Sequence, residues 1–378
     1  ILAYPLSLLA YSISGYFLLS AGIKFNKYSV IITMALFLII TAVFFRKRID
    51  IKSLINKNTL IYIALAVILT LVSVSGIVPV SATNDSMYFF SEYPRALVHY
   101  EKIGSILDNF LTDASQGIAI IATLPFFYGF DEIFGVQTLL NINFLAFFAY
   151  AVQSYASTRL DKKNTYVITF VSIVMLVTSM PFVLMSRWFM ANAFFMEYMA
   201  VILYFSYEFS LKEETDRADL LVLAVLITGL SIMRMEGALN AGVLILSIMM
   251  LKFKSKDIAL YFLSPVLILQ SLYLYRIFIK ITLHTKIQFM TKEKAVVLIA
   301  FLIIIMLYAL LIRNRLPEKL EKNYGYLLVL SLIAVNLVIL VYDRSGYIIN
   351  LKAFIFNMLK NSGWGLFVPF VIGVFILI

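Results

Sequence analysis

Apolar runs of about 15 to 22 residues recur along this sequence from one end to the other, and each approaches the roughly 20 residues that an α-helix needs to cross the ~30 Å hydrocarbon core of a bilayer. The chain is 62% hydrophobic and only 14% charged, so it has too little polar surface to cover a water-soluble globule. The pattern therefore predicts an all-α, polytopic transmembrane protein with about 12 membrane segments. We place these segments near 1–21, 29–45, 60–80, 134–156, 165–185, 193–209, 219–233, 237–251, 258–275, 295–312, 325–341 and 364–378.

One apolar stretch, 117–130, is too short to cross a membrane and contains Pro125 and Gly129. We predict that it forms an interfacial or re-entrant helix on the outer side. The first residue is Ile1 and the last apolar run stops at Ile378 without a polar flank, so we expect the numbered chain to be part of a longer one.

The basic residues define an orientation. Five short loops hold 17 of the 31 Lys and Arg, and placing these loops in the cytoplasm agrees with both the alternation of the segments and the positive-inside rule. The longest outward segment, 81–133, then carries only Arg95 and Lys102. The same rule accounts for the net charge of +10 without a nucleic acid partner. The chain has no cysteine and only two histidines, His99 and His284, which argues against thiol-ligated metals, zinc and redox chemistry, and no metal site is predicted.

The outer stretch 81–115 differs from every other loop, because carboxylates are interleaved with basic and aromatic side chains. An aromatic ring packs against the apolar face of a pyranose while carboxylates accept its hydroxyl protons, so the set predicts a sugar-binding surface. The alternative is a solvated interfacial loop with an aromatic belt. We take Glu92, Tyr93, Arg95 and His99 as candidate substrate-binding residues.

Asp85 follows closely on the predicted membrane segment 60–80, within the sequence Asn84-Asp85-Ser86. A carboxylate held at the end of a helix near the interface is suited to act as a general base, so Asp85 is the candidate catalytic residue. The alternative is a helix cap for the turn that follows. His99 titrates near neutrality and could shuttle protons, although a lone His in an interfacial helix more often only forms a hydrogen bond.

Two short apolar runs, 219–233 and 237–251, flank the sequence Arg234-Met235-Glu236. Each run covers about 22 Å of the ~30 Å core at ~1.5 Å per residue, so we expect the turn between them to be recessed below the outer surface. Charges at such a depth are costly unless they pair or line a wet cavity. Arg234 and Glu236 therefore either form a pair that locks the turn, or belong to a site in which the guanidinium of Arg234 binds a phosphate.

Three further charged places complete the candidates. Arg187 falls outside in this topology, where it either binds a phosphate or anchors its helix end by snorkelling. Glu197 lies about four residues into the segment 193–209, where it must pair with a basic group or face a cavity. The outer stretch 276–294 is a basic patch able to attract lipid phosphates.

An acidic residue soon after an early membrane segment, a long outer loop with amphipathic stretches around 88–108, and a later pair of short helices carrying Arg-x-Glu-Gly together resemble the GT-C superfamily of integral membrane glycosyltransferases. The resemblance covers roughly 60–251 and rests on short motifs. It implies a polyprenyl-phosphate-linked sugar donor, a catalytic carboxylate at Asp85 and a donor-phosphate contact at Arg234. Two features depart from the family pattern: two apolar segments precede the catalytic loop, and Ser86 follows Asp85 where the family often has a second acidic residue.

We therefore expect a membrane glycosyltransferase that moves a sugar from a polyprenyl-phosphate donor to a glycan, lipid or protein acceptor of the cell envelope. The expected location is the plasma membrane of a prokaryote, in contact with membrane lipid and with the active site facing outside. A divalent metal is compatible with the abundant carboxylates, but no spacing of ligands requires one. The alternatives are a transporter or flippase of lipid-linked sugars, in which no bond changes, and a transferase similar to O-antigen ligases or polymerases.

We expect the chain to form a single transmembrane domain over 1–378. Within it, 1–59 forms two N-terminal helices, 60–251 forms the catalytic module with the outer loop 81–133, and 252–378 forms the C-terminal helices. An internal repeat of the kind common in secondary transporters is not evident in the sequence.

Overall fold

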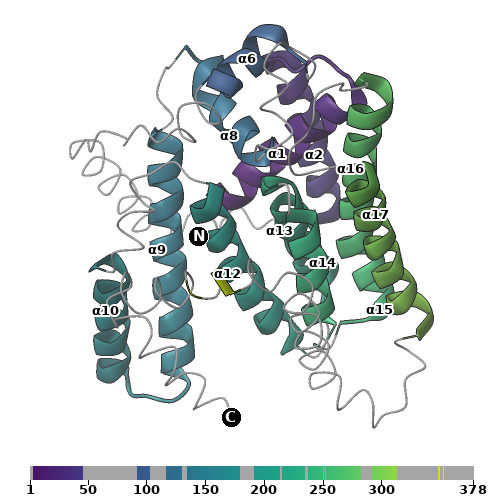
Figure 1. Ribbon diagram of the computed structural model, residues 1–378. Coiled ribbons are helices and arrows are strands. Elements are labelled where there is room, and N and C mark those ends of the chain that lie inside the picture. The colour runs from purple at the N-terminus through teal and green to yellow at the C-terminus, as the bar shows by residue number, and fades with distance from the viewer. Residues whose placement is uncertain are drawn as a thin grey trace. The chain divides into compact units, whose positions relative to one another are not determined.

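The computed structural model forms helices and no strands in the part of the chain that it describes (Figure 1). That part comprises 3–45, 92–102, 116–129, 134–178, 191–212, 215–234, 237–249, 253–281 and 292–312, with the isolated positions 251, 348–349 and 352. The all-α fold class predicted from the sequence is confirmed for these residues.

The described helices coincide closely with the predicted apolar segments, because long apolar runs bounded by charged loops delimit helices well. The predicted segments 60–80, 325–341 and 364–378 lie outside the described residues. The helices are α1 (Ala3–Ala21), α2 (Lys27–Phe45), α6 (Tyr93–Tyr100), α8 (Gln116–Phe127), α9 (Phe134–Ser157), α10 (Lys162–Thr178), α12 (Ala191–Ser210), α13 (Arg217–Met233), α14 (Gly237–Ile248), α15 (Ser255–Asp257), α16 (Ser264–Tyr275) and α17 (Lys292–Leu307). Three π-helical segments extend them, η2 (Ile258–Leu263), η3 (Arg276–Ile281) and η4 (Tyr308–Ile312).

The chain divides into two compact units. The first contains 1–147 and 188–315, and the second contains 148–187 and 316–378. Helix α9 begins in the first unit and ends in the second, which also contains α10. All candidate site residues that the structure describes belong to the first unit.

Two of the described helical stretches are long and apolar enough to cross a membrane. They are Ser255–Phe278, which runs from α15 into η3, and Lys292–Ile312, which consists of α17 and η4. The helical stretches Lys27–Ile39, Gln116–Phe127 and Gly237–Ile248 are apolar but shorter. The length and composition of the two long stretches agree with an association of the chain with a membrane.

Helix α1 forms the centre of the first unit, where it packs against α2, α8, α13 and α16 (Figure 1). Leu9, in the middle of α1, is fully buried and lies directly over Gly229 of α13. Small residues at such a crossing let two helix backbones approach closely, which is typical of helix pairs in membranes. The position of α1 therefore brings the helices that follow it in the sequence into one bundle.

Helix α8 is buried around its whole circumference along its first two turns, since every residue from Gln116 to Thr123 is buried. An interfacial helix would expose one side to water or to lipid headgroups. The burial therefore favours the re-entrant alternative for the helix predicted at 117–130. Pro125 lies in the last turn of α8, and Gly129 with φ +77° follows it, so the chain leaves the helix at this point.

Segments that are predicted to face outside lie together in this unit. The backbone N–H of Phe25, in the loop between α1 and α2, donates to the carbonyl oxygen of Glu101 at the end of α6 over 2.7 Å. Gly22, in the same loop, lies against the guanidinium of Arg276, where α16 continues into η3. Similarly, α15 packs against η4, and both of these adjoin loops that are predicted to face inside. The structure thus groups loops to which the sequence analysis assigns the same side, and the side of the membrane itself stays a prediction.

Candidate active site

The structure describes five of the eight candidate site residues. Glu92, Tyr93, Arg95 and His99 lie on or next to α6, and Arg234 lies at the end of α13. The candidate base Asp85, the candidate phosphate ligand Arg187, and Glu236, the predicted partner of Arg234, lie outside the described residues.

Helix α6 is a short amphipathic helix, as predicted for the outer loop. Pro94 stands in its first turn, where its missing N–H costs no hydrogen bond. Glu92, Arg95 and His99 occupy positions i, i+3 and i+7, so they form one exposed stripe along the helix. The Glu92 carboxylate is 3.9 Å from the Arg95 guanidinium, which also stands over the ring of Phe126 in α8 at 5.4 Å. The stripe is therefore a polar surface on which an acidic and a basic side chain are both exposed.

Tyr93 points away from this stripe and into the protein. Its side chain is only 2% exposed, and its hydroxyl donates a hydrogen bond to Oε1 of Gln116 at the start of α8 over 3.1 Å. A ring in this position does not present its face to a sugar, so the predicted role of Tyr93 in substrate binding does not fit the structure. Tyr93 instead anchors α6 on α8, together with the buried Leu97.

The other end of α6 is held by the loop between α1 and α2. Glu101 adopts a left-handed conformation with φ +56° and donates its backbone N–H to the carbonyl oxygen of Leu97, which ends the helix. Its own carbonyl accepts the N–H of Phe25, and its carboxylate lies 3.9 Å from the exposed ammonium of Lys24. Backbone hydrogen bonds and burial thus fix both ends of α6, whereas the surface ion pair contributes little.

The start of α8 connects α6 to the predicted phosphate-binding turn. Gly117, next to the residue that binds Tyr93, packs directly on the backbone of α13: a Cβ at position 117 would lie only 2.8 Å from the carbonyl oxygen of Ile232. The hydroxyl of Ser12 in α1 donates to the carbonyl oxygen of Gly117 over 2.8 Å. Since Ile232 lies two residues before Arg234, the structure brings together two regions that are about 140 residues apart in the sequence and that were selected independently.

The turn that carries Arg234 is held by a hydrogen bond from α16. Arg234 itself is extended, and its carbonyl oxygen accepts the N–H of Gly237, at the first position of α14. The side-chain amide of Gln270 donates to the carbonyl oxygen of Ser231 over 3.0 Å, which satisfies a carbonyl that the end of α13 leaves open. Gln270 lies six residues, or about 9 Å of helix, before Arg276, whereas Ser231 lies only about 4.5 Å before Arg234. The Arg234 turn is therefore recessed by about one helical turn relative to Arg276.

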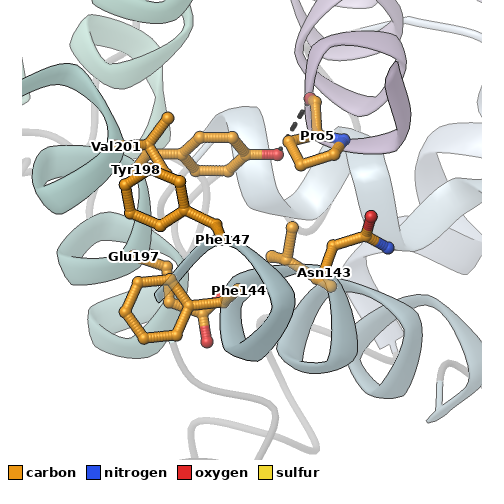
Figure 2. A pocket seen from close by; sticks show the side chains of 8 residues that line it. Pro5, Asn143, Phe144, Phe147, Glu197, Tyr198 and Val201 are labelled. Carbon is orange, nitrogen blue, oxygen red and sulfur yellow. Dashed lines mark hydrogen bonds between the residues drawn. The ribbon is translucent and has the colours of Figure 1, made fainter. Parts of the chain in front are cut away.

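Glu197, which the sequence requires either to pair or to face a cavity, faces a cavity (Figure 2). Its carboxyl oxygen Oε2 is buried and has no hydrogen-bond partner, and no ion pair of Glu197 occurs in the described part of the chain. The neighbouring Tyr198 donates its hydroxyl to the carbonyl oxygen of Pro5 over 3.1 Å. Pro5 lies 17 residues, or about 25 Å of helix, before Gly22, so Glu197 is far from the end of α1 that contacts α6.

Sequence reasoning did not select the residues that join these elements, namely Gln116, Ser12 and Gln270. Each is a polar side chain within or next to an apolar run, and each is buried and hydrogen-bonded. Because an unpaired polar group is costly in apolar surroundings, a lone Gln in such a run is itself a reason to expect a partner on another helix. No cluster of three or more His, Asp or Glu side chains suited to a metal ion occurs among the described residues.

Comparison with known proteins adds no family to these observations. Protein-family models, curated protein sequences and solved structures all give no match to this chain. The function is therefore inferred from the residues of the site and from the way in which the fold gathers them.

Proposed function

We propose that this protein is an integral membrane glycosyltransferase of the GT-C type, which moves a sugar from a polyprenyl-phosphate donor to a cell-surface acceptor on the extracytoplasmic face. The observation that carries the proposal is the junction at the start of α8. Tyr93 of α6 binds Gln116, and the adjacent Gly117 packs on the α13 backbone two residues before Arg234. A loop with sugar-binding character and a recessed arginine suited to phosphate thereby belong to one connected structure.

The surfaces of several helices support a location in lipid. On α2, Ile31, Ile32 and Ile39 are each more than half exposed, and on α17 the same holds for Val296 and Ile304. In water, contiguous apolar faces of this kind cause association or aggregation, whereas in a bilayer they face acyl chains of the same polarity. We therefore assign these helices to the membrane, within a total of about 12 segments.

In the proposed mechanism the donor enters from the outer leaflet, and the guanidinium of Arg234 or of Arg187 binds its phosphate. The exposed stripe of α6, with Glu92, Arg95 and His99, contacts the sugar or the acceptor. Asp85 removes the proton from the acceptor hydroxyl while the oxygen of that hydroxyl attacks the anomeric carbon of the sugar. The bond from the anomeric carbon to the phosphate breaks, and polyprenyl phosphate leaves as an anion. Arginine stabilises the charge of this leaving group, and a well-placed base contributes about 10²–10⁴-fold in rate.

The test is sugar transfer in purified membranes, with radiolabelled polyprenyl-phosphate sugars as donors and extracted cell-surface acceptors. We expect wild-type membranes to transfer label, Asp85→Asn to lose about 10²–10⁴-fold of the rate, and Arg234→Ala to bind the donor more weakly. Arg217→Ala is the matched control, because Arg217 is an exposed arginine at the opposite end of α13. Full transfer by correctly folded Asp85→Asn protein would contradict the catalytic role of Asp85.

A second candidate function is a transporter or flippase of lipid-linked sugars. The specific observation in its favour is Glu197, because a conduit requires polar groups along the membrane thickness. Glu197 lies on α12 beside Pro5 of α1, and Pro5 is about 25 Å along α1 from Gly22, near the end of α1 that contacts α6. Reconstituted protein distinguishes the two functions. An enzyme forms a new glycosidic bond without moving its donor, whereas a transporter moves the donor to the other leaflet and leaves it chemically unchanged.

A further inference from the structure

Two carboxylates among the described residues of the first unit are buried and not used by the proposed catalytic site, Glu197 and Asp219. Asp219 is paired with the ammonium of Lys212 at 2.6 Å, whereas Glu197 has no such partner in the described structure. Its side chain lies on α12 and is 8% exposed, and Oε2 has no hydrogen-bond partner in the described structure. A carboxylate in apolar surroundings without a partner is expensive when ionised, and such residues in membrane helices are functional by default. Glu197 therefore needs a ligand that removes its charge.

The cavity beside Glu197 limits the size of that ligand. It is lined by Pro5 of α1, by residues of α9 and by residues of α12, and it has room for about one water molecule, about 10 Å³. The contribution of α9 includes Asn143 and the rings of Phe144 and Phe147 (Figure 2). An organic substrate or a hydrated metal ion does not fit into such a space.

Among the described residues, the groups around Glu197 offer no positive charge that would compensate an ionised carboxylate. In the described part of the chain, the titratable groups that interact with one another beside the cavity are Glu197, the hydroxyl of Tyr198 on the same helix and the hydroxyl of Tyr4 on α1. Helix α9 contributes only Leu140, Asn143, Phe144 and Phe147 to the cavity lining, and α13, which packs on α12, contributes no lining residue. None of these groups carries a positive charge that would stabilise an ionised Glu197.

A bare cation is not matched by the arrangement of oxygens. A sodium or calcium ion needs several oxygen ligands that converge on one point. The carbonyl oxygen of Pro5 accepts the hydroxyl of Tyr198, and the amide of Asn143 and the carboxyl of Glu197 point to different sides in Figure 2. A proton, in contrast, needs only one carboxylate oxygen.

We propose that Glu197 is a proton-binding site of the folded protein, with the adjoining cavity as the space through which one water molecule delivers and removes the proton. In the occupied state the carboxyl is neutral, and α9 and α12 close around it. Loss of the proton leaves a carboxylate in the apolar corner, which weakens the contact between these two helices and admits water. The proposal does not depend on the glycosyltransferase function, because the Glu197 site at Pro5 shares no side chain with the junction at Ser12 and Gly117, about 10 Å further along α1.

The test compares the thermal stability of the full chain in detergent for the wild type and Glu197→Gln. Glutamine has nearly the shape of a protonated glutamate but has no proton to lose. Between about pH 6 and about pH 10, we expect the melting temperature of the wild type to fall relative to that of Glu197→Gln by at least about 2 °C. Glu208→Gln, the same change on the same helix, is the matched control and should follow the wild type. Parallel curves for the wild type and Glu197→Gln would overturn the proposal.

Infrared spectroscopy gives a second readout, which does not depend on the stability of a variant. A neutral carboxyl group buried in the wild-type protein absorbs as a carbonyl at neutral pH, and alkaline titration should remove this band. The band should persist in Glu208→Gln and be missing from Glu197→Gln. A wild-type spectrum that lacks a buried neutral carboxyl at neutral pH, or one that Glu197→Gln leaves unchanged, would overturn the proposal.

Discussion

Replacing Gly117 by alanine is expected to separate α8 from α13 and to disturb the Arg234 turn. The added Cβ would stand 2.8 Å from the carbonyl oxygen of Ile232 and 3.0 Å from the hydroxyl oxygen of Ser12. A normal contact at this point begins near 3.4 Å, so the backbones must move apart by about 0.6 Å. A rotamer change of a neighbouring side chain does not relieve the main overlap, because it involves a backbone atom.

The size of the effect follows from two destabilising contributions and one stabilising contribution. Overfilling a packed interface costs about 1–3 kcal/mol, and a displaced α8 weakens the hydrogen bond from Ser12 to Gly117, worth about 1 kcal/mol. Alanine in place of glycine stabilises a helix by up to about 1 kcal/mol, and this gain is smaller near the helix start, where Gly117 lies. We therefore expect a net loss of about 1–3 kcal/mol in the free energy of unfolding.

The assay is thermal unfolding in detergent. Unfolding is measured as the fraction of protein that is no longer monodisperse after heating. Gly242→Ala is the matched control, since Gly242 is also buried in a helix but the three atoms nearest to its added Cβ belong to the side chains of Phe301, Leu302 and Ile305. The closest is a ring atom of Phe301 at 2.6 Å, and a side chain can turn aside where a backbone atom cannot. We expect Gly117→Ala to melt several degrees below the wild type, and Gly242→Ala to be affected less. If Gly117→Ala is as stable as the wild type, the close contact between α8 and α13 does not exist in solution.

Three further substitutions test individual contacts by the same thermal assay. Gln270→Leu should cost about 1–3 kcal/mol, because the carbonyl oxygen of Ser231 loses the amide that binds it in a buried position, and an unchanged stability would show that this carbonyl has another partner. Tyr11→Phe should cost about 1 kcal/mol through loss of the buried hydrogen bond to Thr123, and a Thr123→Val background should remove most of that difference. Asp216→Ala should cost about 1 kcal/mol, because the Asp216 carboxylate accepts the N–H groups at the start of α13, whereas Asp216→Asn should retain most of the stability.

The sequence predicts the helices of this fold well, and the reason is physical. A long apolar run satisfies its backbone hydrogen bonds within itself when it forms a helix, so α1, α12 and α13 appear within a few residues of their predicted bounds. The exposed stripe with Glu92 and Arg95 also follows from local periodicity. These are properties of one segment at a time, and they do not depend on where the segment packs.

The contacts that assemble the candidate site depend on packing and are not available from one segment. Tyr93 belongs to an aromatic set that is typical of sugar binding, but α6 rotates this ring inward because Gln116 offers a buried acceptor. Gln270 and Ser231 lie 39 residues apart on different helices, and nothing in either apolar run predicts their hydrogen bond. The sequence could only state the two alternatives for Glu197, and the packing of α9 against α12 leaves it facing a cavity.

Helix α1 connects the two proposed sites and also separates them. Near its start, the carbonyl oxygen of Pro5 binds Tyr198 beside the Glu197 cavity, and further along, Ser12 binds Gly117 at the junction with Arg234. These positions are seven residues, or about 10 Å of helix, apart, and they share no side chain. In a one-sided glycosyltransferase, Glu197→Gln should therefore leave sugar transfer nearly unchanged while Arg234→Ala reduces it. If Glu197→Gln stops the movement of a lipid-linked sugar and no bond is formed by the wild type, the proton site belongs to a transport cycle.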